Sequence, residues 1–507
     1  MKYILDDIVL ELGQSEVALR KTLAKRLRVA ETSFRYEIRG QELFLRGGKR
    51  YINYRVTIET LEFIRDTSVR FMPNVNQYSL PKNTLKDCPV IVGAGLSGLF
   101  CAYALALAGV KPIVLEKGKA LSQRLNDVIS FERAGKASAY TAYTSGQGGI
   151  LGLTGFRMDR YSDALGKRWA IDVIENMAQV HSKNRFCFLS SSQAQVLTDG
   201  LIREITSRGG EVIFGAEFTG AKTFLGRIKE AKYKQGAFEK SIPTNHIVLA
   251  TGENNIPLYN ALAKKNEPIN ISTISFFLEK DLSEYYKATS GSSRESSRIP
   301  SLFFVKPEKS KADMETMISF FYPHAAPMLL SKAAHQVNLG LQLDSEKSGN
   351  GLTVISLRPN GALTSASAQL LTKSAFKKAI PYHCPGEPIK DFLSSKNPLR
   401  LGQVKGAYPL GTYLEDFHSI LPRNIADALK EQIENLSRDY PVFTDGRALL
   451  IGPSICYENG RRLLKNDGGK PAIKGLFLAA PKRSWDYDGV EAALGGLDAA
   501  TSVLENK

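Results

Sequence analysis

The segment that decides the fold runs Pro89-Val90-Ile91-Val92-Gly93-Ala94-Gly95-Leu96-Ser97-Gly98. Its apolar opening predicts a buried strand, and the glycines follow in the pattern Gly-x-Gly-x-x-Gly. The apolar residues up to Ala108 predict a helix that ends at Gly109. Val110–Leu115 predicts a second strand, which leads into Glu116. This order of elements predicts a βαβ unit.

Each position of this motif has a physical role in holding a dinucleotide. Gly93 permits the tight turn, Gly95 lets the backbone approach a pyrophosphate, and Gly98 lets helix and strand pack closely. The first N–H groups of the helix provide a partial positive charge for phosphates. Glu116 follows the last glycine by 18 residues, a spacing at which an acid accepts hydrogen bonds from a ribose diol. The motif therefore predicts a dinucleotide site.

Three features favour FAD over NAD. Lys117-Gly118 and Gln123-Arg124 follow the ribose-binding acid as they do in flavoproteins, and Ala250-Thr251-Gly252 is similar to a second flavoprotein turn. The chain also ends with a predicted strand and helix over 475–504, as flavoproteins do to complete the flavin pocket. The residues predicted to bind the cofactor are Gly93, Gly95, Leu96, Ser97, Gly98, Glu116, Lys117, Arg124, Gly148, Gly149, Phe218, Thr251, Gly252, Gly489 and Val490.

On these motifs the chain resembles the FAD-dependent oxidoreductases known as NAD- or FAD-utilizing dehydrogenases, which belong to the glutathione-reductase-like class of two-domain flavoproteins. The resemblance is strongest over 90–124 and extends to 146–149, 318–323, 452–462 and 489–500. It departs at 321–326, where relatives have a Cys-Met-Cys-Pro-Gly-Gly run, so no thiol step is expected there. It also departs at 479–488, where a Gly-Glu-Gly turn is missing.

The resemblance implies an α/β fold: a Rossmann-type FAD-binding domain with an inserted mixed α+β substrate domain and a small N-terminal α+β (ferredoxin-like) domain. We place the N-terminal domain at 1–85, where strands are expected over 34–38, 42–46 and 51–58. The FAD-binding domain covers 86–255 and returns at 460–507. The substrate domain covers 256–459.

The composition excludes several classes of protein. The 507 residues contain five cysteines and no Cys-x-x-Cys pair, so we expect no disulfide scaffold and no metal site. The acidic start of the chain lacks the cationic and apolar segments of a signal peptide, and we expect a cytoplasmic protein. Residues 90–110 carry no charge, but their glycines argue against a membrane span.

Only one dinucleotide fingerprint is present, so we expect either a small organic substrate or transiently bound NAD(P)H to reduce the flavin. The candidates for acid–base chemistry are His324, Tyr322, Asp486 and Tyr487; an imidazole titrates near neutral pH and is suited to carry a proton. The helix that opens at Gly489 is expected to direct its N-terminus at the flavin. His246 and Cys101 are interpreted as core residues.

Three functions are compatible with these features. The first is an FAD-dependent dehydrogenase or reductase that acts on a small molecule, and the second is a flavin-dependent monooxygenase. The third is an RNA-associated or non-catalytic flavin-binding protein. It is suggested by the net charge of +16 and by the cationic residues over 20–28. Nucleic-acid binding is the less expected alternative, because the cations fall opposite Leu19, Leu23 and Leu27 on a predicted helix, as on a solvated face.

Overall fold

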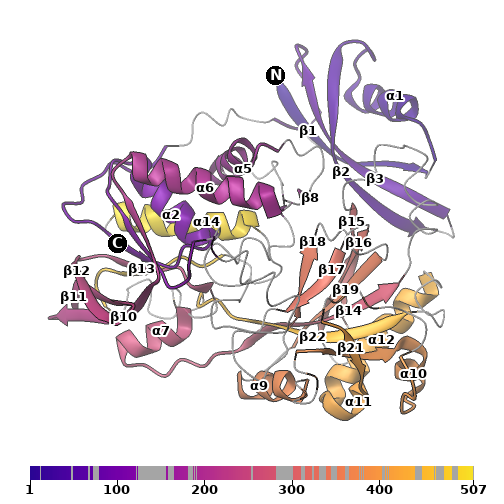
Figure 1. The fold of residues 1–507 in the computed structure, drawn as a ribbon. Helices are drawn as coiled ribbons and strands as arrows, with labels where there is room; N and C mark the ends of the chain where they lie inside the picture. The colour runs from indigo at the N-terminus through magenta and orange to yellow at the C-terminus, as the bar shows by residue number, and fades with distance from the viewer. Residues whose placement is uncertain are drawn as a thin grey trace.

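Figure 1 shows the protein, a computed structural model, as three connected parts: an N-terminal sheet with a helix beside it, a nucleotide-binding sheet with helices packed on it, and a large sheet with helices at one end. The structure describes residues 1–11, 13–46, 49–66, 69–71, 79–120, 123, 156–157, 165–180, 186–187, 189, 191–252, 255–280, 301–309, 314–322, 325–329, 339–343, 351–359, 365–375, 377, 380, 382–401, 406, 408, 410–439, 448–461, 463, 473–481 and 489–505.

The N-terminal part is a four-stranded antiparallel sheet with the strand order β2-β3-β1-β4, which is the order of a ferredoxin-like fold. Its elements are β1 (Lys2–Glu11), α1 (Glu16–Leu27), β2 (Phe34–Arg46), β3 (Lys49–Thr60) and β4 (Arg70–Phe71). The predicted apolar stripe of α1 is buried in one core with Val56 and Ile58 of β3. The predicted break between 38 and 42 is wrong. The second strand is continuous, and a register shift between Ile38 and Gly40 accommodates one extra residue, Arg39.

Arg20 of the cationic helix is held within this domain. Its Nη1 atom donates to the carbonyl oxygens of Glu31 and Phe34 at 2.6 and 3.3 Å. Its guanidinium lies 5.4 Å from the ring centroid of Phe34 and 5.1 Å from that of Tyr36. This residue of the predicted solvated face therefore stabilises the return of the chain into β2.

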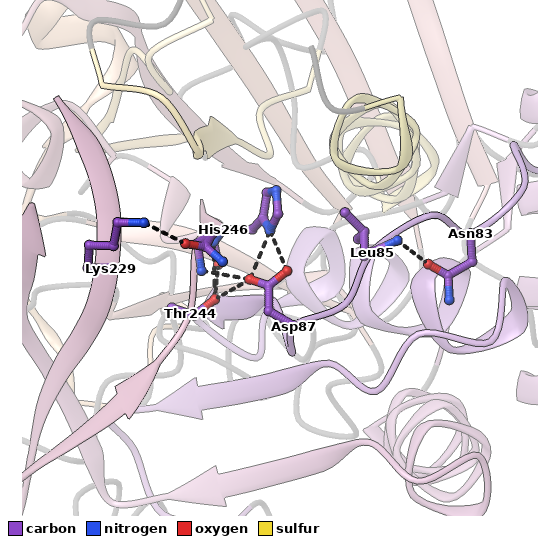
Figure 2. Close-up of polar contacts among 7 residues, drawn as sticks. Asn83, Leu85, Asp87, Lys229, Thr244 and His246 are labelled. Atoms are coloured by element: carbon purple, nitrogen blue, oxygen red, sulfur yellow. Dashed lines mark hydrogen bonds and ion pairs between the residues drawn. The ribbon is translucent and has the colours of Figure 1, made fainter. Parts of the chain in front are cut away.

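The linker into the nucleotide-binding part is anchored by Asp87 (Figure 2). Its carboxylate accepts the N–H of Asn245 at 2.6 Å and lies 3.0 Å from Nδ1 of His246. Burial opposes ionisation of Asp87, but the hydrogen bonds from Asn245 and His246 outweigh it, so the pKa is lowered. His246 is buried and stacks on Phe477, as a core residue would, yet its ring is also part of a polar anchor.

The nucleotide-binding part is a five-stranded parallel sheet with the order β23-β13-β5-β6-β9. Its elements are β5 (Val90–Val92), α2 (Leu96–Leu107), β6 (Ile113–Glu116), α5 (Leu165–Ala178), α6 (Ser191–Ser207), β9 (Glu211–Phe214), β13 (Ile247–Leu249), α7 (Asn255–Ala263), β23 (Leu476–Leu478) and α14 (Gly489–Leu504). The βαβ unit predicted from the glycine motif is confirmed.

Alternate side chains of this sheet enter two different cores. Ile91, Val114 and Val248 pack with the helices α2, α5, α6 and α14. Val92 and Leu249 face the opposite core, which they share with α7 and a three-stranded meander. The meander consists of β10 (Ala216–Phe224), β11 (Arg227–Gln235) and β12 (Phe238–Pro243), and β7 (Phe156–Arg157) pairs separately with β8 (Phe186–Cys187). The sheet is thus covered on both faces, which leaves its carboxyl edge as the site of a crevice.

The large sheet has seven strands in the order β15-β16-β19-β14-β22-β20-β21 and is antiparallel except for the pair β20–β21. Its elements are β14 (Ile271–Lys280), β15 (Ser301–Lys309), β16 (Glu315–Tyr322), β19 (Gly351–Arg358), α9 (Ser365–Ser374), β20 (Cys384–Pro388), α10 (Ile389–Ser394), β21 (Thr412–Leu414), α11 (Phe417–Ile420), α12 (Arg423–Asp439) and β22 (Leu449–Tyr457), with the separate pair β17 (Ala325–Leu329) and β18 (Leu339–Leu343). In chain order this sheet is inserted between β13 and β23, so the fold class predicted from the sequence is confirmed. Among the described helices, none has both the length and the apolar character needed to cross a membrane.

Candidate functional site

The glycine turn after β5 requires glycine at two of its three positions. Gly93 has a φ of +104°, and a Cβ atom there would lie 2.8 Å from the carbonyl oxygen of Ala250. A Cβ atom on Gly98 would overlap the carbonyl oxygen of Gly93. Side chains at these positions would therefore push the turn away from both α2 and the neighbouring strand β13.

The start of α2 presents backbone N–H groups at the carboxyl edge of the sheet. Gly95 is the N-cap in an extended conformation, and neither a side-chain cap nor an acid occupies the first turn among the residues described there. The first main-chain hydrogen bond of the helix runs from Leu99 N to the Gly95 carbonyl oxygen at 2.9 Å. The preceding N–H groups, of Leu96, Ser97 and Gly98, can therefore serve an anion. The Leu96 side chain itself is buried in the core.

Glu116 connects the glycine turn to the end of β6. Its Oε2 atom accepts the N–H of Ala94 at 2.9 Å, and its Oε1 atom accepts the N–H of Gly118 at 2.7 Å. The side chain is 2% exposed, so the carboxylate is fixed in place. A carboxylate oxygen has two acceptor positions, and the carboxylate can therefore also accept hydroxyl groups. The adjacent Lys117 forms an exposed ion pair with Glu217, with Nζ and Oε1 2.6 Å apart.

Asn255 joins the turn after β13 to the end of β23, and the sequence reasoning missed it. Its Oδ1 atom accepts the N–H and the hydroxyl of Thr251 at 2.8 and 3.0 Å. Its Nδ2 atom donates to the carbonyl oxygens of Asn459 and Ala479 at 3.1 and 3.5 Å. The side chain is fully buried. This one amide holds three chain segments at the carboxyl edge of the sheet, including the predicted Thr251-Gly252 turn, where Gly252 has a φ of +64°.

Asn459 and Arg461 extend this network to the last helix. Asn459 Nδ2 donates to the Pro481 carbonyl oxygen at 3.2 Å. Arg461 Nη1 donates to the Ala480 carbonyl oxygen at 3.0 Å and to Asp498 Oδ2 of α14 at 3.3 Å. These residues lie on the segment that leaves the large sheet. The only signal in the sequence was their position in the stretch 452–462, which contributed to the family resemblance.

Two adjacent glycines let α14 pack closely, Gly496 against α2 and Gly495 against the segment that follows β23. A Cβ atom on Gly496 would overlap the carbonyl oxygen of Ser97, and one on Gly495 would lie 2.7 Å from the backbone of Ala480. The last helix of the chain therefore lies beside the first helix of this sheet, as the yellow ribbon of α14 and the purple ribbon of α2 in Figure 1 show. Val490, which was predicted to bind the cofactor, is fully buried in the helical core.

The remaining predicted residues fall outside this cluster or outside the described residues. Phe218 is 8% exposed and packs between the meander and the sheet. Tyr322 is the last residue of strand β16 in the large sheet. Arg124, Gly148, Gly149, His324, Asp486 and Tyr487 lie outside the described residues. Among the described residues, no group of three or more His, Cys, Asp or Glu side chains is arranged to hold a metal ion.

Among the described acidic groups, Glu387 of the large sheet has a strongly shifted pKa. Its carboxyl group is fully buried, and Oε2 accepts the N–H of Phe417 at 2.8 Å. Burial is the largest cause that raises its pKa to about 8, and the nearby Asp416, Asp391 and Glu415 contribute. This group lies on β20, which belongs to a different sheet from the glycine turn.

Two family models match the chain. Residues 91–138 match the NAD(P)-binding Rossmann-like domain, and residues 350–455 match the C-terminal domain-like region of FAD-dependent proteins. The chain is an FAD-dependent protein. The matches place it among FAD-dependent enzymes of the oxidoreductase superfamily, with FAD as the cofactor. The first match covers the glycine turn and Glu116, and the second covers most of the large sheet from β19 to β22.

Similar proteins and structures cover most of the chain at low identity. An uncharacterized protein of Clostridium beijerinckii is 21% identical over 468 residues, which is 87% of this chain and 85% of that protein. CtdE in complex with FAD has a TM-score of 0.37 at 9% identity and covers 83% of this chain and 84% of its own. A geranylgeranyl bacteriochlorophyll reductase-like protein of Thermoplasma acidophilum has a TM-score of 0.36 at 12% identity, with 83% and 78% covered.

The geometry of the described residues fits FAD. The side-chain-free turn at Gly93 and Gly98, the uncapped N-terminus of α2 and the fixed carboxylate of Glu116 meet at one edge of the sheet. These are the groups that a pyrophosphate and an adjoining ribose require. When bound, FAD supplies hydride and electron transfer, and the protein supplies binding, orientation and electrostatics.

Proposed function

We propose that the protein exchanges hydride between its bound FAD and a small organic substrate, with NAD(P)H as a reductant that binds transiently. The observation that supports this best is the convergence of the glycine turn, the α2 N-terminus and Glu116 at the carboxyl edge of the sheet. The large sheet inserted between β13 and β23 is the part of the chain we propose to bind the substrate.

Each described group has a proposed part in binding. The N–H groups of Leu96, Ser97 and Gly98 bind the pyrophosphate, and the partial positive charge of the α2 N-terminus strengthens this contact. Glu116 accepts the ribose hydroxyls while it keeps its own hydrogen bonds to the turn. The turn at Thr251, fixed by Asn255, forms the neighbouring wall of the crevice.

The sequence carries one glycine-rich dinucleotide fingerprint. A reductase with a dedicated nicotinamide domain would have a second, so NAD(P)H is proposed to approach the flavin without a domain of its own. If no nicotinamide reduces the flavin, the organic substrate itself is the hydride donor.

The test starts from the visible absorption spectrum of the purified protein. Bands near ~375 and ~450 nm are expected from oxidised FAD. The substitution Gly95→Asp should abolish them, because a carboxylate at this position opposes the pyrophosphate sterically and electrostatically. Leu225→Asp is the matched control: it adds the same charge at a hairpin turn where the side chain is 85% exposed. The proposal fails if Gly95→Asp retains FAD as well as the control does.

The reductant is identified by anaerobic mixing of the FAD-loaded protein with NADH and with NADPH. Bleaching of the flavin bands by either nucleotide supports transient nicotinamide reduction. No bleaching by either, with full bleaching by dithionite, contradicts that part of the proposal and selects the organic substrate as donor. A substrate-derived product that gains one oxygen atom from O₂ would instead select the monooxygenase alternative.

A further inference from the structure

We infer that the ion pair between Lys167 and Glu491 sets the reduction potential of the bound flavin. The two residues join the third residue of α5 to the first turn of α14, with Nζ and Oε1 3.5 Å apart. Both side chains are only 13% exposed. The inference rests on the proposed binding of FAD at the carboxyl edge of the sheet.

The first turn of α14 extends beyond this edge on the side of the crevice. Gly495 contacts Ala480 and Pro481, which follow the last strand β23, and Gly496 contacts Ser97 in the first turn of α2. The C-terminal end of α14 lies beside the middle of β23 and not at its carboxyl edge, because Thr501 and Ser502 line a cavity of about 320 Å³ together with Phe477 of β23.

The direction of α14 follows from these contacts. The helix runs opposite to β23, and its first residue lies seven positions before Gly496. At a rise of 1.5 Å per residue, this start lies about 10 Å beyond the α2 N-terminus. Glu116, the proposed ribose-binding acid, ends β6 on one side of β5, whereas β13 and β23 lie on the other side. An FAD molecule with its ribose at Glu116 and its pyrophosphate at α2 therefore continues over β13 toward β23. The helix α14 follows β23, so its N-terminus lies on the flavin side of the phosphates.

The charges at this helix start have opposite effects on a reduced flavin. The N-terminus of α14 carries a partial positive charge, which favours the negative charge that reduction places on the cofactor. Glu491 is the one acid in the first turn of α14 and opposes it. Lys167 neutralises Glu491, and the low exposure of both groups strengthens the interaction relative to water.

Substitutions of the two partners should therefore shift the flavin midpoint potential in opposite directions. Lys167→Met leaves the carboxylate uncompensated and lowers the flavin midpoint potential. Glu491→Gln leaves the cation together with the helix N-terminus and raises the potential. For each variant we expect at least a tenfold change in the two-electron reduction equilibrium, which is about 30 mV. The double variant should return close to the potential of the parent protein.

The experiment is an anaerobic redox titration of the FAD-loaded full chain against a reference dye, followed by the flavin bands. Free FAD is removed by gel filtration before the titration, so that the bands report bound flavin and partial loss of protein in a variant does not move the midpoint. Lys167→Arg preserves the positive charge and should keep the parent potential. The control pair is Arg208→Met and Glu204→Gln, which breaks an ion pair of 3.1 Å at the C-terminal end of α6 whose side chains are 43% exposed.

The outcomes separate this inference from the proposed function. If the parent protein takes up no FAD, the proposed function fails and no potential is measured. If FAD binds but both variants shift the potential in the same direction, or neither moves it further than the control pair does, the inference is overturned. A shift to lower potential for Lys167→Met, to higher potential for Glu491→Gln, and a parent value for Lys167→Arg supports it.

Discussion

Asn255 should be the side chain on which the carboxyl edge of the nucleotide-binding sheet depends. Replacing it with leucine removes all four of its hydrogen bonds from a fully buried position. It leaves the Thr251 N–H and the Asn459 carbonyl without the partner that Asn255 provides. A buried polar group that loses its partner costs about 1–3 kcal/mol, so the loss should be about 2–6 kcal/mol, concentrated at these segments.

Asn255→Asp divides the network into two halves. A carboxylate can still accept the N–H and hydroxyl of Thr251, but it cannot donate to Asn459 or Ala479 and places negative charge against their carbonyl oxygens. The turn after β13 should therefore stay protected, whereas the segments around 459 and 479 should loosen.

Hydrogen–deuterium exchange followed by mass spectrometry measures these segments separately, which suits a chain of several domains better than one global unfolding transition. We expect faster exchange over 249–256, 459–461 and 479–481 in Asn255→Leu, and over the last two segments only in Asn255→Asp. Asn260→Asp is the matched control on the same helix, since the Asn260 side chain bonds only Glu267 in the interactions described. Unchanged exchange in Asn255→Leu would refute the assigned role.

Two further predictions concern titratable groups. Asp87→Asn should destabilise the anchor to His246 by about 1–3 kcal/mol at neutral pH. The lowered pKa of Asp87 means that its contribution is present above its ordinary value of 3.8 and is lost as the pH falls through the lower folded value, so thermal unfolding of the parent and variant should converge in acid. A difference that grew in acid would be inconsistent with this anchor. The pKa of Glu387 is raised from 4.5 to about 8, so the folded protein keeps this carboxyl group neutral over a range in which the unfolded chain ionises it. The contribution of Glu387 to the free energy of unfolding is therefore fully present below pH 4.5 and is lost as the pH rises to about 8. The free energy of unfolding of Glu387→Gln should therefore rise relative to that of the parent by up to about 1.4 kcal/mol for each pH unit between these two values. Parallel pH profiles of the two unfolding midpoints would argue against a buried neutral carboxyl group.

Local patterns in the sequence were sufficient for the elements around the cofactor. The strand before Gly93, the helix that follows and the strand that ends at Glu116 are all encoded within 27 consecutive residues, from Val90 to Glu116, by apolar runs and glycine positions. The last helix is also observed over the predicted range, 489–504.

Contacts between distant parts of the chain could not be predicted in this way. Asn255 and Asn459 are 204 residues apart, and the fold brings them together only because the large sheet is inserted between two neighbouring strands. An asparagine just after a Thr-Gly turn is a common local hydrogen-bonding residue, which was the available signal. His246 was interpreted as core because its flanking residues are apolar, and its partner Asp87 lies 159 positions earlier.

Binding of FAD at the glycine turn is measured by titrating the apoprotein with FAD and recording the quenching of flavin fluorescence. We expect saturation at one FAD per chain, and no saturable binding in Gly95→Asp under the same conditions. An apoprotein that is folded by circular dichroism but binds no FAD at any excess would contradict it.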